Sequence, residues 1–302
     1  MLFLQGLRSS YAGAALVGTR TARYFEAMFD SSSPSRPAVQ PPAPRPLGQV
    51  NWLGLWTLYL KEVRRFLNVI TQTVLAPMVT ALLFLAIFTL ALGRGDLVVH
   101  GLPYALFLAP GLIVMTMLQN SFANTSSSVL ISKVQGNIVD VLMPPLSSFE
   151  FTLAYAAAGV TRGLLVGLVT GVAMMVFVPL PLHQPIAIFW FAFNASLMLA
   201  LLGLIGGIWA EKFDHIAAVT NFVVVPLSFL SGTFYSVERL PENWLFIAHL
   251  NPFFYLIDGF RYGLIGVHDG DILRGAVIVG VVNAVLWALA YGLVSRGYKL
   301  KP

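Results

Sequence analysis

The residues that could do chemistry are few, and one polar stretch between two apolar segments holds most of them. The run SSSVLISKVQGNIVDVLMPPLSS, residues 126–148, carries Lys133, Gln135, Asn137 and Asp140, while its neighbours carry almost no ionisable side chains. These side chains can form hydrogen bonds and ion pairs, but they make no recognisable acid–base or nucleophilic set. The stretch therefore indicates a surface that another protein acts on.

Motifs that would place catalysis in this chain are absent from its sequence. There is no Cys, no H-E-x-x-H and no G-x-x-x-x-G-K-[ST] phosphate loop, and there is no Gly-Lys dipeptide at all. The five histidines, at positions 100, 183, 215, 249 and 268, fall in predicted loops or at the ends of apolar segments, where a histidine is usually structural. We therefore expect no catalytic residue, no bound cofactor and no metal site, and a membrane-embedded enzyme is disfavoured.

The polar stretch itself predicts a short helix at a membrane surface. Its apolar residues recur three to four apart, which gives one apolar face, and they are Val129, Leu130, Val134, Ile138, Val141 and Leu142. The pair Pro144–Pro145 should end the helix, because proline cannot donate the helical hydrogen bond.

Composition predicts an integral membrane protein. Of 302 residues, 57% are hydrophobic and 10% charged, against about 25% charged in a soluble domain. The net charge of +5 would suggest nucleic acid in a soluble protein, but the placement of Lys and Arg argues against such a partner.

Six apolar segments are long enough to cross a hydrocarbon core of about 30 Å. They cover residues 69–92, 103–123, 150–178, 186–209, 216–235 and 273–294. With the N-terminus inside, the inner segments hold thirteen Lys and Arg and the outer ones four, which favours cytoplasmic termini. The remaining basic residue, Arg162, lies within the long third segment, and we expect its side chain to reach the inner membrane interface.

Two further segments precede the first span. Residues 1–48 include six prolines between Ser31 and Gly48, and we predict a disordered extension there. From residue 50 to 66 the bulky residues step by four and three, which predicts an interfacial amphipathic helix with Trp52 and Trp56 at headgroup depth. Its basic residues Lys61, Arg64 and Arg65 would lie near anionic lipid.

The segment between the fifth and sixth spans predicts two short helices, 241–249 and 252–265. Pro241 and Pro252 stand where helices begin, and Asn251 is a natural cap. The aromatic residues, Trp244, Phe246, Phe253, Phe254, Tyr255, Phe260 and Tyr262, would rest both helices in or re-entering the outer interface. Asp258 and Arg261, three residues apart, can pair on one face.

The runs SGTFYSVERLP and HLNPFFYLIDGFRYGLIG resemble the hallmark of the ABC-2 type transporter permeases, and within them the YadH-like branch of bacterial inner-membrane permeases. The resemblance extends from about residue 51 to 296, including QGNIVDVLMPPLSS and FDHIAAVTNFVVVPLSFLSGTFYS. It implies an all-α transmembrane domain over residues 49–302, with an N-terminal elbow helix, six spans, a cytoplasmic coupling helix between spans two and three, and re-entrant helices before span six.

The resemblance also implies the partners and the division of labour. A second permease chain, as a homodimer, and two copies of a separate ATP-binding subunit would complete the transporter, with ATP and Mg on that subunit. The coupling helix maps to about residues 128–143, with Lys133, Gln135, Asn137, Ile138, Asp140 and Leu142 facing the ATPase, and helix breaking at Ile138 should uncouple transport. The implied location is the bacterial inner membrane, among membrane lipids.

Substrate identity stays open at this point. A lipid-like, glycan-linked or amphipathic cargo would suit an apolar interior with polar Asn120, Asn124, Asn194, Asn221 and Asn283, although each can equally bond a neighbouring helix. The alternatives are an ion-coupled secondary transporter, which generally needs ionisable residues near mid-membrane, and a non-transporting scaffold of the same fold.

Overall fold

The computed structural model describes residues 48, 50–92, 98–239 and 241–300, all within the compact unit Leu47–Pro302. The predicted disordered extension lies, apart from Gly48, outside the described residues.

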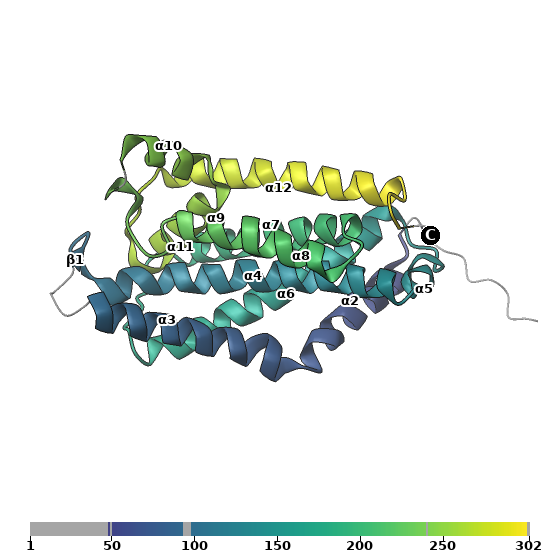
Figure 1. Cartoon of the computed structure of the whole chain (residues 1–302), viewed down its shortest axis with the longest axis horizontal. Helices are drawn as coiled ribbons and strands as arrows, with labels where there is room; N and C mark the ends of the chain where they lie inside the picture. Colours follow the sequence, from purple (N-terminus) through teal and green to yellow (C-terminus); the bar gives the residue numbers. More distant parts are fainter. Residues whose placement is uncertain (1–47, 49, 93–97, 240, 301–302) are drawn as a thin grey trace, which may run out of the picture. The chain divides into compact units, whose positions relative to one another are not determined.

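The described chain is a helical bundle with one small hairpin (Figure 1). Its elements in order are α2 (Trp52–Leu67), η1 (Thr71–Leu75), α3 (Ala76–Leu92), β1 (Val98–Val99), β2 (Leu102–Pro103), α4 (Tyr104–Val134), α5 (Ile138–Leu142), α6 (Ser148–Met175), α7 (Pro185–Trp209), α8 (Phe213–Val219), η3 (Thr220–Val224), α9 (Val225–Leu230), η4 (Val237–Arg239), α10 (Glu242–Leu250), α11 (Pro252–Ile265) and α12 (Ile272–Ser295). The strands pair antiparallel, with Val98 opposite Pro103. The long helices alternate in direction, so α5 lies at one end, the α5 end, and the hairpin at the other, the β1 end (Figure 1).

Six helical segments in this part of the chain are long and apolar enough to cross a membrane. They are Thr71–Ala91, Tyr104–Val134, Ser148–Met175, Pro185–Trp209, Phe213–Leu230 and Ile272–Ser295. The predicted all-α fold with six spans is confirmed, and α10 and α11 match the two predicted short helices within one residue.

The second span is longer than predicted, since α4 continues from residue 123 to Val134. The extra turns are rich in hydroxyls that bond to carbonyl oxygens one turn earlier, as Ser126 does to Phe122 at 2.7 Å and Ser132 to Ser128 at 2.9 Å. Because the hydroxyls are satisfied within the helix, these residues stay buried. The predicted coupling helix 128–143 is therefore two pieces, the end of α4 and the five-residue α5, separated at Gly136, whose φ is +75°.

Two prolines within the spans, Pro77 and Pro226, coincide with wide helical turns. Pro77 follows the π-helical turn η1, and Pro226 follows η3. Proline collides with the carbonyl four residues earlier, and in both cases that carbonyl lies inside the π-helical turn, where bonds run to the fifth residue instead.

Small residues on α6 and α7 allow the central helices to approach closely. A Cβ on Gly159 would lie 2.6 Å from the Ala200 Cβ, and one on Gly167 would lie 2.5 Å from the Met117 sulfur. On α7, a Cβ on Gly203 would lie 2.5 Å from the backbone oxygen of Phe122. Backbones at this separation admit only glycine.

Replacing Gly203 with alanine should therefore destabilise the bundle by about 1–3 kcal/mol, the usual cost of overpacking. The new methyl would also displace Thr125, whose hydroxyl donates to the Ala200 oxygen at 2.8 Å. The matched control is Gly280→Ala on α12, where a Cβ meets nothing within 4 Å. Thermal unfolding in detergent should show a lower midpoint for Gly203→Ala only; equal midpoints would contradict the packing.

The second short helix, α11, lies deep in the protein. We expected it in the outer membrane interface or re-entering it, and Phe253, Phe254, Tyr255 and Phe260 are buried where α11 packs against α4, α7 and α12, which is consistent with a re-entrant helix. Its glycines explain the depth, because Cβ atoms on Gly259 and Gly263 would collide with Phe191 and Ile188 of α7. Of the two short helices, α10 is the one with exposed aromatic residues, Trp244 and Phe246.

Candidate functional site

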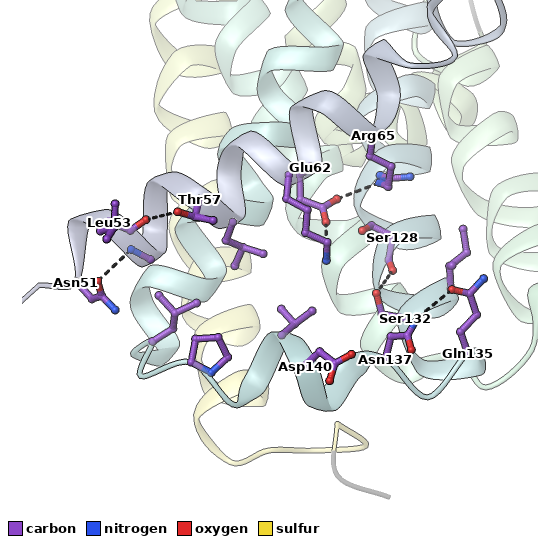
Figure 2. Close-up of a pocket in the computed structure, with 17 residues that line it drawn as sticks. Asn51, Leu53, Thr57, Glu62, Arg65, Ser128, Ser132, Gln135, Asn137 and Asp140 are labelled. Carbon is purple, nitrogen blue, oxygen red and sulfur yellow. Dashed lines mark hydrogen bonds and ion pairs between the residues drawn. The ribbon is translucent and has the colours of Figure 1, made fainter. Parts of the chain in front are cut away.

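A groove of about 810 Å³ lies between α2, the last turns of α4 and α5 (Figure 2). From the predicted coupling residues it is lined by Gln135, Asn137 and Asp140, and from the predicted elbow residues by Lys61 and Arg65. The structure thus brings together polar side chains from both predicted surface helices. Figure 2 shows Asp140 and Asn137 on one wall and Glu62 and Arg65 on the other.

The charged residue deepest in this groove is Glu62, which the sequence reading missed. Its side chain is 0% exposed, although it stands in a helix of otherwise exposed charges. Arg65 contacts it at 3.1 Å and Lys61 at 3.7 Å. Arg65 also donates to the backbone oxygen of Asn124 at 2.8 Å and to its side-chain oxygen at 3.0 Å. A buried carboxylate needs such partners, and here they fasten α2 to α4.

A second set of bonds fastens the start of α2 to the segment that follows α5. Ser147 and Glu150 form a capping box at the start of α6, with the Glu150 oxygen Oε2 accepting from the Ser147 backbone at 2.7 Å. The other oxygen, Oε1, accepts from the backbone of Asn51 at 2.6 Å. The Asn51 amide in turn donates to the Pro145 oxygen at 3.2 Å. These bonds join the α5–α6 connection to the start of α2.

The apolar face of α5 is divided between interior and surface. Ile138 and Val141 are buried in a cluster with Leu58 of α2 and Val129 of α4. Val134, Val139, Leu142 and Met143 are exposed, Met143 at 75%. The predicted face therefore belongs in part to the core, and Val139 and Met143, which the sequence reading did not single out, present apolar surface at the tip. We call Val139, Leu142 and Met143 the α5 tip.

Lys133 has internal partners. Its ammonium donates to the backbone oxygens of Ile208 and Ala210, both at 2.6 Å, at the C-terminal end of α7, where a cation satisfies unpaired carbonyls. Nearby, Lys299 donates to Glu211 at 2.6 Å, and this bond lowers the pKa of the Glu211 carboxyl and raises that of Lys299.

The elbow helix turns Leu58, Glu62 and Phe66 inward. Trp52, Trp56 and Arg64 are exposed, the placement that headgroup contact requires.

The predicted ion pair of Asp258 and Arg261 lies inside the protein at the β1 end. Asp258 and Arg261 are both buried, with Oδ1 and Nη1 3.9 Å apart. Arg261 also donates to the Gly232 oxygen at 2.6 Å and lies 3.9 Å above the Phe107 ring. Burial raises the pKa of Asp258 and lowers that of Arg261, while each partner's charge opposes the shift. Asn251 caps α11 as predicted, accepting from the Phe253 backbone at 3.0 Å, and Pro252 occupies the first turn.

Polar groups within the spans bond to neighbouring helices. Arg162 donates to the Asn120 side chain at 2.9 Å, so the residue expected to reach the interface has a protein partner on α4. Asn283 of α12 donates to Asn194 of α7 at 2.9 Å. Asn221 is exposed on η3.

Comparison with known proteins identifies the family. The ABC-2 type transporter family model matches residues 54–265, which include α5, α11 and most of the residues that line the groove. The sequence is 34% identical over 252 residues to the inner membrane transport permease YadH of Escherichia coli K12, covering 83% of this chain and 98% of that protein. It is 25% identical over 260 residues to nodulation protein J of Sinorhizobium fredii, covering 83% of this chain and 95% of the relative. This chain therefore belongs to the ABC-2 type transporter family, as a permease subunit.

Proposed function

We propose that this permease forms the membrane pathway of an exporter in a bacterial inner membrane, and that a separate ATP-binding subunit drives it from the α5 end. The observation that carries the proposal is the exposed apolar α5 tip beside a polar groove. Apolar residues at the end of a bundle, outside the length needed to span lipid, mark a protein contact. The excess of Lys and Arg on the segments at this end supports a cytoplasmic location, and the relative in E. coli is named as an inner membrane protein.

In this proposal, force enters through α5 and spreads along two routes. One runs through Ile138 and Val141 into the cluster they share with α2, α4 and α6. The other runs through the α5–α6 connection, the Glu150 carboxylate and Asn51 into the start of α2. Both routes reach α2, so a displacement of α5 by the ATPase tilts the elbow against α4, where Arg65 holds Asn124.

A second copy of the permease would complete the pathway. The spans Thr71–Ala91 and Phe213–Leu230 are the least buried of the six, at 17% and 11%. Between α3 and α4 lies a cavity of about 270 Å³ with polar Gln72, Thr80 and Gln119 on its wall. Polar side chains facing hydrocarbon are costly, which favours a second chain and a polar passage over lipid at this face. Such a passage between apolar spans suits an amphipathic or lipid-like cargo.

Reconstitution tests the proposal. The permease should be purified with and without the ATP-binding subunit encoded beside it, and ATP hydrolysis measured in lipid nanodiscs. We expect a complex with two copies of each chain, in which hydrolysis is lost when the phosphate-loop Lys of the ATPase is replaced. Hydrolysis by the permease alone, or proton-driven transport without nucleotide, would contradict the proposal, and the latter would favour a secondary carrier.

A further inference from the structure

Three side chains able to bind a metal meet at the β1 end, far along the bundle from the groove. They are His100 in the turn between β1 and β2, Glu238 in η4, and Asp269 in the loop between α11 and α12. One ligand atom from each lies within 4.8 Å of the others. The His100 nitrogen Nε2 and the Asp269 oxygen Oδ1 are 2.8 Å apart.

Surrounding bonds fix the aspartate. Its side chain is 1% exposed, and its oxygen Oδ2 accepts from the Val237 backbone at 2.8 Å. Ser236 donates to Oδ1 at 3.1 Å, and its hydroxyl lies 3.2 Å from the His100 ring nitrogen. His100 is held with φ at +51°, a conformation uncommon for residues other than glycine. The hydrogen-bonded aspartate provides a fixed ligand, and the more exposed His100 and Glu238 can adjust to it.

The ligand types and spacing suit zinc. With Zn–N and Zn–O bonds of about 2.0–2.1 Å, neighbouring ligands of a tetrahedral site lie about 3.3 Å apart. The His100 and Asp269 atoms, 2.8 Å apart, are already within this separation, and Glu238, whose ligand atom lies within 4.8 Å of both, needs to approach by at most about 1.5 Å. One imidazole with two carboxylates favours Zn²⁺ over the all-oxygen sites of Mg²⁺ and Ca²⁺, and water can complete the set.

The negative charge of the carboxylates at this place also favours binding of a cation. Glu238 and Asp269 face each other, and the carboxylate of Asp258 accepts from the Asp269 backbone at 2.7 Å. Arg261 is occupied by Asp258 and the Gly232 oxygen. Glu238 and Asp269 also line an open cavity of about 1040 Å³, so an ion can reach them from outside the bundle.

We propose that His100, Glu238 and Asp269 form a Zn²⁺ site that clamps the β1–β2 turn and η4 to the loop between α11 and α12. The site ties the segments above three different spans into one unit at the β1 end. From the sequence, which holds no Cys and no H-E-x-x-H motif, we expected no metal site.

The test is Zn²⁺ binding by the full-length permease, purified in detergent without a histidine tag and stripped with a chelator. Equilibrium dialysis followed by elemental analysis should give one Zn²⁺ per chain, and Zn²⁺ should raise the unfolding midpoint. His100→Asn and Glu238→Gln should each weaken binding by at least about 10-fold, because losing even a group that only orients a metal ligand typically costs about 10–100-fold in affinity. Asparagine tolerates the left-handed backbone of His100, so this variant should fold normally.

His215→Ala is the matched control, because His215 lies in α8 beside the C-terminal end of α7 and outside the cavity that Glu238 and Asp269 line. It should bind Zn²⁺ as the wild type does. The proposal is overturned if the wild type takes up no Zn²⁺ at micromolar concentrations, or if His100→Asn and Glu238→Gln bind it as tightly as His215→Ala.

Discussion

Replacing Leu142 and Met143 together with aspartate should weaken binding of the ATP-binding subunit by at least about 100-fold. Met143 is 75% and Leu142 38% exposed, and neither belongs to the buried cluster around Ile138, so the bundle core does not depend on them. Fully burying each against a partner contributes about 1.5–3 kcal/mol, and a tenfold change in affinity needs only about 1.4 kcal/mol. The introduced carboxylates would add the cost of placing charges in an apolar contact.

Copurification with the tagged ATPase and titration of the purified subunits measure this effect. Val98→Asp is the matched control, because Val98 is an apolar residue at the β1 end whose exposed fraction, 51%, lies between those of Leu142 and Met143. It should leave both the complex and ATP hydrolysis unchanged. If the Leu142→Asp, Met143→Asp double variant bound the ATPase with wild-type affinity, the α5 tip would not be the docking surface.

The structure also indicates a better variant for testing whether ATP hydrolysis is coupled to transport through α5. Helix breaking at Ile138 was the obvious choice from sequence, but Ile138 is the first residue of α5. Proline is tolerated at that position, because its missing N–H would have no helical partner. Charge reversal at the exposed Asp140, which lines the groove, leaves the backbone undisturbed and is the sharper test.

Hydropathy predicted the six spans because a membrane leaves few alternatives to long apolar helices. It failed at the end of α4, where Asn124 to Ser128 look like a loop in sequence. The hydroxyls of Ser126 and Ser127 donate to carbonyls of their own helix and that of Thr125 to the Ala200 oxygen of α7, while the Asn124 side-chain oxygen accepts from Arg65. These partners depend on helix packing, so the length of α4 could not be read from local hydropathy.

The sequence predicted the elements of the candidate site but not the groove between them. The polar stretch and the predicted elbow helix could be recognised as separate surface elements, whereas their shared groove depends on tertiary contacts. Glu62 looked like one of several exposed charges until Arg65 and α4 enclosed it. The depth of α11 had a local signal that went unused, since Gly259 and Gly263 are four residues apart and form a smooth helix face.

The largest stability effect should come from Arg261→Ala. The guanidinium is 1% exposed and serves three partners, the Asp258 carboxylate, the Gly232 oxygen and the Phe107 ring. Breaking a buried ion pair by removing one member costs about 3–5 kcal/mol, because the remaining charge stays buried without compensation. That is a large share of a typical folding free energy of about 5–15 kcal/mol.

Arg261→Lys should recover only part of this loss, because an ammonium cannot contact the carboxylate, the carbonyl and the ring face in one planar arrangement. Arg274→Ala is the control, since Arg274 is exposed near the start of α12 and its removal should change stability by less than about 0.5 kcal/mol. Thermal unfolding and size-exclusion profiles in detergent should rank the proteins wild type and Arg274→Ala, then Arg261→Lys, then Arg261→Ala. If Arg261→Ala unfolded together with the control, the arginine would not be what anchors α11 to α4 and to the loop after α9, and the β1 end would depend on apolar packing alone.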